Sequence, residues 1–433
     1  MLRRKARERL DDWRASGRSK ALLVTGARQV GKTYLVERFA EESYRHVVKF
    51  DLVDRVDVLA AADAARSSEE LFLAFSAFAG DEMVPGETLI FIDEVQRCKE
   101  AVTFVKYLVQ REGFDYVLSG SLLGVELQGV RSLPVGYLDV VEMFPLDFEE
   151  FCWANGVGED VWAAARRARA GLESLFGPVH DRLLTLFHRY LMVGGMPAAV
   201  NALLDTGNLA RVKAEQDSIL ELYRMDVSRY ARGDTLYVRD IFDQIPSQLS
   251  TQGKRFTFSS VRPRGTFDDF ARDFLWLVNA GVALEVRNVS EPRHPLRLSE
   301  NRKLFKLFMN DVGLLSAACG MEVAKSIVSD RLGVNYGAVY ENAVAQELHA
   351  QGRGLYYFRS KAAGEVDFVL EAGGGRVLPV EVKSGKDYKR HSALDNVMRT
   401  PNYAIDSAVV LHDGNVERDG KVAYLPVYMA SLL

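Results

Sequence analysis

The sequence is poor in cysteine, and its three cysteines stand far apart. Cys98, Cys152 and Cys319 fall in no C-x-x-C spacing. A disulfide framework or a structural zinc site is therefore not expected. Unpaired cysteines fit a reducing compartment, and we expect a cytoplasmic protein.

Long hydrophobic runs are also missing. No apolar run reaches the roughly 20 residues that a membrane-spanning helix needs. The opening stretch, residues 1–17, is charged throughout and lacks the apolar centre of a signal peptide. We expect no membrane partner, and an amphipathic helix that leads into the first domain.

Charge of one sign is lacking as well. Lysine and arginine number 55, aspartate and glutamate 59, and the formal net charge is -4. No global basic field draws the chain to nucleic acid, so binding DNA or RNA would need a local patch. The length of 433 residues suggests about three domains at roughly 150 residues each.

Short apolar runs alternate with helix-length segments between residues 20 and 151. The runs ALLVT, VVKFDL, TLIFID and YVLSG are brief, rich in β-formers and bounded by turn residues. This alternation predicts an α/β fold in which a parallel sheet carries helices on its faces. We assign residues 1–152 to this domain.

The remaining chain divides into three further predicted parts. Residues 153–232 have helical periodicity, broken by the turn VGGMP, and are expected to form a helical lid. Residues 233–300 predict three helices and a short ribbon, an order that resembles a winged-helix module. Residues 301–433 are mixed, with AGGGR predicted as a hairpin turn between two alternating runs.

The stretch GARQVGKT, residues 26–33, fits the pattern G-x-x-x-x-G-K-[ST] at every fixed position, between a strand and a helix. Backbone N–H groups of such a loop point at phosphates, and the helix N-terminus adds favourable partial charge. Lys32 would reach the β- and γ-phosphates, and Thr33 would hold magnesium. The expected nucleotide-binding residues are Gly26, Ala27, Arg28, Gln29, Val30, Gly31, Lys32 and Thr33.

The second half of this site is expected at the end of the strand TLIFID. Asp93 would hold the magnesium ion through water, and Glu94 would orient and activate the attacking water. The alternative for this pair is a helix N-cap acid. At the end of the strand YVLSG, Ser119 or Ser121 could sense the γ-phosphate, although serine and glycine at a strand end are as often a turn.

Four stretches, LLVTGARQVGKT, IFIDEVQ, YVLSGSLLG and EMFPLDFEEF, resemble a large group of predicted AAA+-type ATPases of bacteria and archaea, related to the archaeal-ATPase and signalling-NTPase lineages. YLMVGGMP is similar to the lid signature of that group, and KLFMNDVGLLSA to the start of the uncharacterised domain that trails these ATPases. The resemblance covers nearly the whole chain and implies ATP as the nucleotide.

One departure from that group concerns the arginine finger. Many relatives carry a Gly-Arg pair before the PLDFEEF-like segment, and this chain has Gly136 and Tyr137 there. A trans-acting arginine cannot be assigned to that position, and nearby Arg131 is a weak substitute. Ring assembly, common for such ATPases, is accordingly an open question.

The C-terminal part holds a second chemical signature. Asp367 lies in GEVDFVL, and Glu381 and Lys383 lie in PVEVKSG, across the glycine hairpin. Alternation puts Glu381 and Lys383 on one face, and Asp367 can face them from the paired strand. Two adjacent carboxylates call for a divalent cation, and Lys383 would position or deprotonate a water or stabilise a leaving phosphate.

This pattern resembles the PD-(D/E)xK nuclease superfamily, in which a preceding helix often contributes a glutamate; Glu341 in VYENAVAQEL matches it. The resemblance implies a restriction-endonuclease-like fold and a second Mg²⁺ or Mn²⁺ held by Glu341, Asp367 and Glu381. The alternative is a surface hairpin with ordinary cross-strand Glu–Lys pairs. Whether the domain still cleaves stays open.

Basic residues interleave with aromatic ones in the winged-helix-like part. Lys254, Arg255, Arg262, Arg264 and Arg272 could neutralise phosphates. Phe256, Phe258 and Phe267 are expected to form the small domain's core instead. Three aspartates in FDDFARDFLWLVNAG oppose DNA contact.

Two functions from different classes follow. The first is an enzyme: an ATPase coupled to a nuclease-like domain that acts on DNA or RNA. The second is an ATP-controlled switch or scaffold whose last domain is inactive and binds a partner or nucleic acid, and the chain could also have a protein partner or form a homo-oligomer. A nucleotide kinase is a weaker third, because kinases with this loop are usually far shorter.

Overall fold

The computed structural model of the chain describes residues 2–17, 19–111, 113–121, 136–230, 237–251, 253–320 and 337–433. The chain forms two compact units. The N-terminal unit is Arg3–Phe144 with Asn279–Gly281, and the C-terminal unit is Pro145–Val278 with Val282–Leu433. The four-part division by sequence stays a prediction, although one sheet described below crosses its boundary at residue 300.

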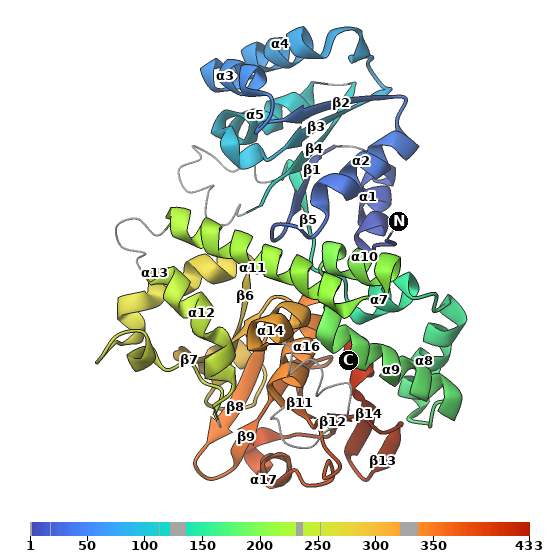
Figure 1. Cartoon of the computed structure of the whole chain (residues 1–433), viewed down its shortest axis with the longest axis vertical. Coiled ribbons are helices and arrows are strands. Elements are labelled where there is room, and N and C mark those ends of the chain that lie inside the picture. The colour runs from blue at the N-terminus through green and yellow to red at the C-terminus, as the bar shows by residue number, and fades with distance from the viewer. Residues whose placement is uncertain are drawn as a thin grey trace. The chain divides into compact units, whose positions relative to one another are not determined.

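The N-terminal unit is built on a five-stranded parallel sheet (Figure 1). Its spatial order is β2-β3-β4-β1-β5. The strands are β1 (Ala21–Thr25), β2 (His46–Asp51), β3 (Thr88–Asp93), β4 (Phe114–Ser119) and β5 (Leu138–Glu142). The parallel sheet predicted from four apolar runs is therefore confirmed, and β5, at the sheet edge, is an addition that the sequence did not signal.

Helices cover both faces of this sheet, because its strands are apolar on both sides. The helices are α1 (Ala6–Ala15), α2 (Lys32–Ser43), α3 (Val56–Ala64), α4 (Ser68–Ala79) and α5 (Lys99–Gln110), with short 3-10 turns at Gly80–Glu82 and Val95–Arg97. One buried cluster joins the sheet to α3, α4 and α5; in it Phe50 stacks on Phe75 with ring centroids 4.9 Å apart. This packing fixes the strand ends that carry the predicted site.

The C-terminal unit begins with a helical stretch, as predicted. Its helices are α7 (Phe148–Ala154), α8 (Glu159–Gly171), α9 (Gly177–Val193), α10 (Pro197–Thr206), α11 (Leu209–Tyr230), α12 (Val238–Leu249), α13 (Phe267–Asn279), α14 (Val312–Cys319), α16 (Gly337–Ala350) and α17 (Ser392–Arg399), with 3-10 turns at Phe258–Ser260, Leu296–Ser299, Pro401–Tyr403 and Val427–Leu432. The VGGMP turn lies between α9 and α10. A Cβ on Gly195 would stand 1.9 Å from the Leu146 carbonyl oxygen, so the turn needs glycine there.

Two sheets complete the C-terminal unit. The first has the order β7-β6-β8-β9 and the second the order β10-β11-β12-β14-β13. The strands are β6 (Ala283–Val289), β7 (Glu300–Met309), β8 (Tyr356–Ser360), β9 (Gly364–Val366), β10 (Phe368–Ala372), β11 (Arg376–Val382), β12 (Ala408–His412), β13 (Glu417–Asp419) and β14 (Val422–Pro426). The predicted AGGGR hairpin is confirmed: β10 and β11 pair antiparallel around it.

The stretch VALEVRNV, predicted as a ribbon of the winged-helix-like part, contains β6, and its antiparallel partner β7 begins only at Glu300, where that part was expected to end. It is not an isolated wing, because β6 also pairs with β8, which follows α16 in the chain. Phe256, Phe274 and Phe305 pack together, with ring centroids of Phe274 and Phe305 4.8 Å apart. Of the three phenylalanines expected to form a small core, Phe256 is buried, whereas Phe258 and Phe267 are half-buried at the edge of this aromatic cluster.

Hydrophobic length is the last general feature. Among the described residues, no single helix is long and apolar enough to cross a membrane; α9 and α10 pass that test only together, with a bend of 119° between them.

Candidate functional site: a phosphate loop and a carboxylate centre

The GARQVGKT stretch forms a loop between β1 and α2. Gly26 has φ +138°, and a Cβ there would stand 2.1 Å from the Met143 carbonyl oxygen, so the position accepts only glycine. Gly31 has φ +92° and precedes the first helical residue, Lys32. The loop thus delivers the N-terminal end of α2 to the carboxyl edge of the sheet, where N–H groups can meet an anion.

Lys32 is buried and turned into this loop. Its Nζ donates to the carbonyl oxygens of Gly26, at 3.0 Å, and Ala27, at 2.8 Å. Burial lowers the pKa of Lys32 to about 8, although the carboxylates of Glu94 and Asp93 act in the opposite direction. Since its hydrogen-bond partners among the described residues are carbonyl oxygens, this buried ammonium would be stabilised by a negatively charged phosphate.

Asp93, at the end of β3, gathers hydroxyl groups from two other elements. Thr33 Oγ1 donates to its Oδ2 at 2.8 Å, and Ser119 Oγ donates to its Oδ1. Lys49 Nζ lies 3.9 Å from Oδ2. The hydroxyl of Thr33 and the carboxylate of Asp93 are oxygen ligands of the kind Mg²⁺ prefers, so the donor set fits that ion.

Glu94 follows with a left-handed backbone, φ +54°. Its Oε2 accepts hydrogen bonds from Gln96 Nε2, at 2.5 Å, and Ser121 Oγ, at 3.3 Å. Non-glycine residues in this conformation cost free energy and cluster at functional sites. The helix-cap alternative does not hold for Glu94, whose side chain accepts no cap hydrogen bond.

The structure therefore brings the predicted P-loop, Asp93, Glu94 and Ser119 together in one unit. Sequence reasoning missed Lys49 and Gln96. Lys49 lies on β2, which pairs with β3, and it is opposite Phe91 in that pairing. Because side chains alternate between the two faces of a strand, the sequence could have indicated on which face of the sheet Lys49 lies. Arg131, the weak arginine-finger candidate, lies outside the described residues.

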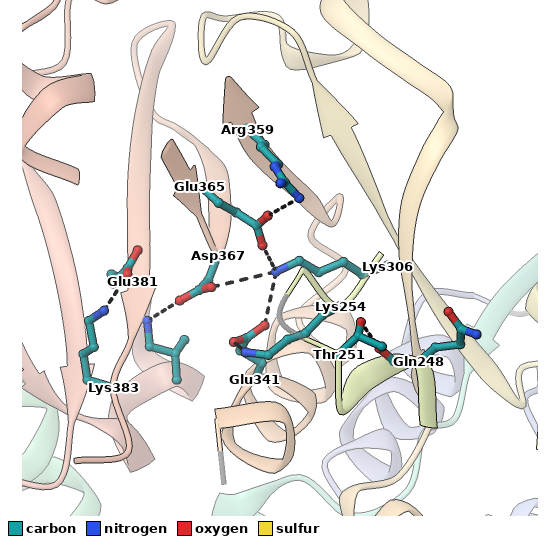
Figure 2. A network of polar contacts seen from close by, with 11 residues as sticks. Gln248, Thr251, Lys254, Lys306, Glu341, Arg359, Glu365, Asp367, Glu381 and Lys383 are labelled. Carbon is teal, nitrogen blue, oxygen red and sulfur yellow. Dashed lines mark hydrogen bonds and ion pairs between the residues drawn. The ribbon is translucent and has the colours of Figure 1, made fainter. Parts of the chain in front are cut away.

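The C-terminal acids also come together, within the second unit (Figure 2). Glu341 comes from α16, Asp367 from the junction of β9 and β10, and Glu381 from β11. Lys383, just past β11, places its Nζ 2.7 Å from Glu381 Oε1. Asp367 Oδ2 accepts from the backbone N–H of Val382 at 2.9 Å, which ties the two strands at this point.

Two further lysines, absent from the predicted site, enter the same cluster. Lys306 of β7 lies 3.2 Å from Glu341 Oε2, 2.9 Å from Glu365 Oε1 and 3.8 Å from Asp367 Oδ1. Lys254 is ion-paired with Glu341. Its assignment as a phosphate-contacting residue of a DNA-binding surface was wrong, because its ammonium is held by an internal carboxylate.

Burial raises the pKa of both Asp367 and Glu381, and for Asp367 the carboxylates of Glu341 and Glu381 add to the effect. Glu341 behaves differently. Burial alone would raise the pKa of Glu341, but the ammonium groups of Lys306 and Lys254 hold that pKa below its ordinary range. Burial alone would lower the pKa of Lys383, but the neighbouring carboxylate of Glu381 outweighs burial and raises that pKa above its ordinary value. A raised pKa favours the ammonium form of Lys383, and its predicted role toward water or phosphate stays a prediction.

The geometry of this cluster bears on metal binding. Within the described ranges, no group of three or more histidine, cysteine, aspartate or glutamate side chains is arranged to hold a metal ion. Glu381 Oε2 is buried and has no hydrogen-bond partner in the part of the chain that the structure describes, a feature that a cation would satisfy. Since Lys306 lies among the other carboxylates, the cluster as arranged does not fit the predicted second Mg²⁺ or Mn²⁺.

Comparison with known families divides the chain in three. Residues 18–152 match the family described as an AAA domain, a range that contains the whole phosphate site. Residues 184–325 and 336–429 match two families described as domains of unknown function, DUF8612 and DUF4143. Residues 18–152 therefore form a P-loop domain of the ATPase type, similar to the AAA family over that range. No curated protein matches the sequence.

Solved structures with some likeness include one described as an ATPase. The Walker-type ATPase PABY2304 of Pyrococcus abyssi is 15% identical over 74% of this chain and 96% of its own, with a TM-score of 0.45. A single-substitution variant of RuvB from Thermotoga maritima is 14% identical, over 68% of this chain and 89% of its own, with a TM-score of 0.26. PCH-2 of C. elegans is 16% identical, over 36% and 48%, with a TM-score of 0.22.

Proposed function

We propose that the N-terminal unit binds ATP with magnesium and hydrolyses it. One observation carries this proposal: Asp93 accepts hydrogen bonds from both Thr33 of the P-loop helix and Ser119 of the neighbouring strand. Three elements that are remote in sequence thereby meet at one carboxylate. Such a meeting point is what a nucleotide-bound magnesium site requires.

Each side chain has a role in this proposal. The loop N–H groups and the Lys32 ammonium hold the β- and γ-phosphates, and Thr33 and Asp93 hold the magnesium ion. Magnesium bound there supplies neutralisation of the phosphate charge. Glu94 orients the attacking water, and Gln96 fixes the carboxylate of Glu94. Ser119 holds Asp93 in place, and γ-phosphate sensing by Ser119 or Ser121 stays a prediction.

The test is steady-state ATP hydrolysis by the purified chain and by Glu94→Gln. We expect loss of hydrolysis by about 100-fold, with nucleotide binding retained, because the substitution removes the charge that orients water and leaves the P-loop intact. Glu41→Gln, on the exposed side of α2, is the matched control and should hydrolyse normally. Equal rates for the chain and Glu94→Gln would contradict the assignment.

A second candidate function concerns the C-terminal acids: metal-dependent cleavage of DNA or RNA. It is favoured by the gathering of Glu341, Asp367, Glu381 and Lys383 and by the unsatisfied oxygen of Glu381. It is opposed by Lys306, which occupies the space among three carboxylates. We therefore place an ATP-controlled switch, whose last domain does not cleave in the resting protein, ahead of an active nuclease.

Cleavage is tested by incubation with plasmid, linear and single-stranded substrates in Mg²⁺ or Mn²⁺. Asp367→Ala and Lys383→Ala are the comparison variants. If the unmodified chain cleaves and both variants do not, the nuclease function is supported. If nothing is cleaved, or if all three proteins cleave equally, it is removed.

Five further proposals rest on the sequence. They are coupling of this domain to ATP, a nucleic-acid or protein partner, self-association, the winged-helix assignment and a cytoplasmic location.

A further inference from the structure

Lys306 is the most unusual buried charge in the described part of the C-terminal unit. Its side chain is 0% exposed, and its Nζ faces carboxylates of α16, β9 and the β9-β10 junction (Figure 2). The acids come from residues 341–381, whereas Lys306 comes from β7, a strand outside the range 336–429 that matches the second domain of unknown function. One part of the chain thus supplies the negative charges and another supplies the cation at their centre.

When every group in this centre is ionised, the positive and negative charges of the described side chains balance. Four carboxylates, those of Glu341, Glu365, Asp367 and Glu381, face four cations, those of Lys254, Lys306, Arg359 and Lys383. A divalent cation added to this set would leave two positive charges in excess, and a proton on Asp367 would make the excess larger. Repulsion between buried charges is strong, so a metal ion can enter only if a protein cation leaves.

The surroundings keep Lys306 charged and in place. Burial lowers its pKa, but Glu341, Asp367 and Glu365 outweigh burial and raise the pKa above its ordinary value. Its ammonium also lies 5.2 Å from the ring centroid of Tyr357. β7 holds the residue opposite Val286 of β6 in an antiparallel ladder.

Lys254 adds a second hold on Glu341. It adopts a left-handed backbone, φ +48°, which costs a non-glycine residue free energy, and its N–H donates to the Thr251 carbonyl oxygen at 3.2 Å. The ion pair with Glu341 offsets part of that cost. Lys254, which follows α12, and Lys306, on β7, both come before α16 in the chain.

We infer that Lys306 is the resident cation of the carboxylate centre: it takes the position of a divalent metal ion and closes the centre to metal while β7 is paired with β6. This inference rests on the second candidate function, for which it supplies the regulation. Cleavage would require β7 to withdraw Lys306, and without that movement the centre is a neutral polar junction that joins β7 to α16.

The experiment measures Mn²⁺ uptake by nucleotide-free full-length protein in equilibrium dialysis. All variants carry Asp93→Ala, so that the phosphate site does not contribute. The parent should take up no Mn²⁺ at this centre. Lys306→Met should gain one Mn²⁺ per chain, bound at least about tenfold tighter than any uptake by the parent, because one protein cation is removed. Lys303→Met, an exposed lysine of the same strand, is the matched control and should behave as the parent.

A third arm separates charge from packing. Lys306→Met with Glu341→Gln removes one charge of each sign, so it should fold and bind no Mn²⁺. If Lys306→Met alone is unfolded, added Mn²⁺ should restore its fold; failure to do so while the double variant folds would overturn the inference. Stoichiometric Mn²⁺ uptake by the parent, or equal uptake by parent and Lys306→Met, would overturn it as well.

The outcome is distinguishable from failure of the candidate nuclease function. Uptake by Lys306→Met without any cleavage would retain the inference and remove the nuclease. Cleavage by the unmodified chain in Mn²⁺, lost in Asp367→Ala, would retain the nuclease and remove the inference.

Discussion

The two units each bury a lysine beside carboxylates, with opposite electrostatic results. Lys32 has carbonyl oxygens as its hydrogen-bond partners, and burial lowers its pKa to about 8. Lys306 has three carboxylates within 3.8 Å, and its pKa is raised. The first lysine is short of negative charge and suited to receive phosphate. The second already has its counter-charges, so its site is closed to further cations.

The largest expected difference is in stability. Lys306→Met should lower the free energy of unfolding by about 3–5 kcal/mol, because it leaves buried carboxylates without their cation. Urea denaturation in the presence of a chelator measures this. Lys303→Met should change it by less than about 0.5 kcal/mol, because that side chain is exposed. Equal effects would mean that Lys306 is not a charge partner of the centre.

The second prediction concerns Lys32 and the rate of ATP hydrolysis. Lys32→Ala should reduce ATP turnover by about 100-fold or more, since it removes the ammonium that meets the phosphates. The exposed residue Lys99 offers the control Lys99→Ala, which should leave turnover unchanged. Turnover that survives Lys32→Ala would break the contrast between the two lysines.

The pH dependence of nucleotide affinity sharpens the contrast. In the free protein the pKa of Lys32 is lowered to about 8, so the ammonium form dominates below that pH, and bound phosphates should raise the pKa again. Affinity should therefore be constant below pH 8 and fall above it, by about tenfold between pH 7.5 and 9.5. Lys32→Arg, which stays charged, should bind with a flat profile. If the nucleotide affinity of the unmodified chain did not change with pH, burial would not lower the pKa of Lys32.

Gln96 gives the smallest effect. Gln96→Ala should lower kcat by about tenfold and leave KM unchanged, because the glutamine positions Glu94 and does not touch ATP. The measurement is a full saturation curve. A rise in KM with kcat unchanged would assign Gln96 to nucleotide binding instead.

Sequence reasoning succeeded where the signal was local. GARQVGKT and the strand TLIFID carry their geometry in short fixed spacings, so the meeting of Thr33 with Asp93 followed from the parallel sheet. β5 was missed because its central residues alternate in exposure at a sheet edge, where the hydrophobic pattern is weak. The roles of the individual site residues stay predictions.

Lys306 was missed for a different reason. Lys306 is neutralised by Glu341, which lies 35 positions further along the chain, and it is held in place by the pairing of β7 with β6. A local hydrophobic periodicity predicts neither of these contacts. A signal did exist: Lys306 interrupts the apolar run LFKLFM, and a lysine inside such a run is seldom buried without a partner. Lys254 was misassigned because a basic, aromatic-rich stretch looks the same whether its charges face DNA or an internal acid.

The most direct test of the contrast between the two sites is Mn²⁺ uptake by the unmodified chain with and without a non-hydrolysable ATP analogue. We expect one tightly bound Mn²⁺ per chain when the analogue is present and none when it is absent, because the phosphate site needs nucleotide and the carboxylate centre holds its own cation. One equivalent bound without nucleotide, and lost in Asp367→Ala, would contradict it.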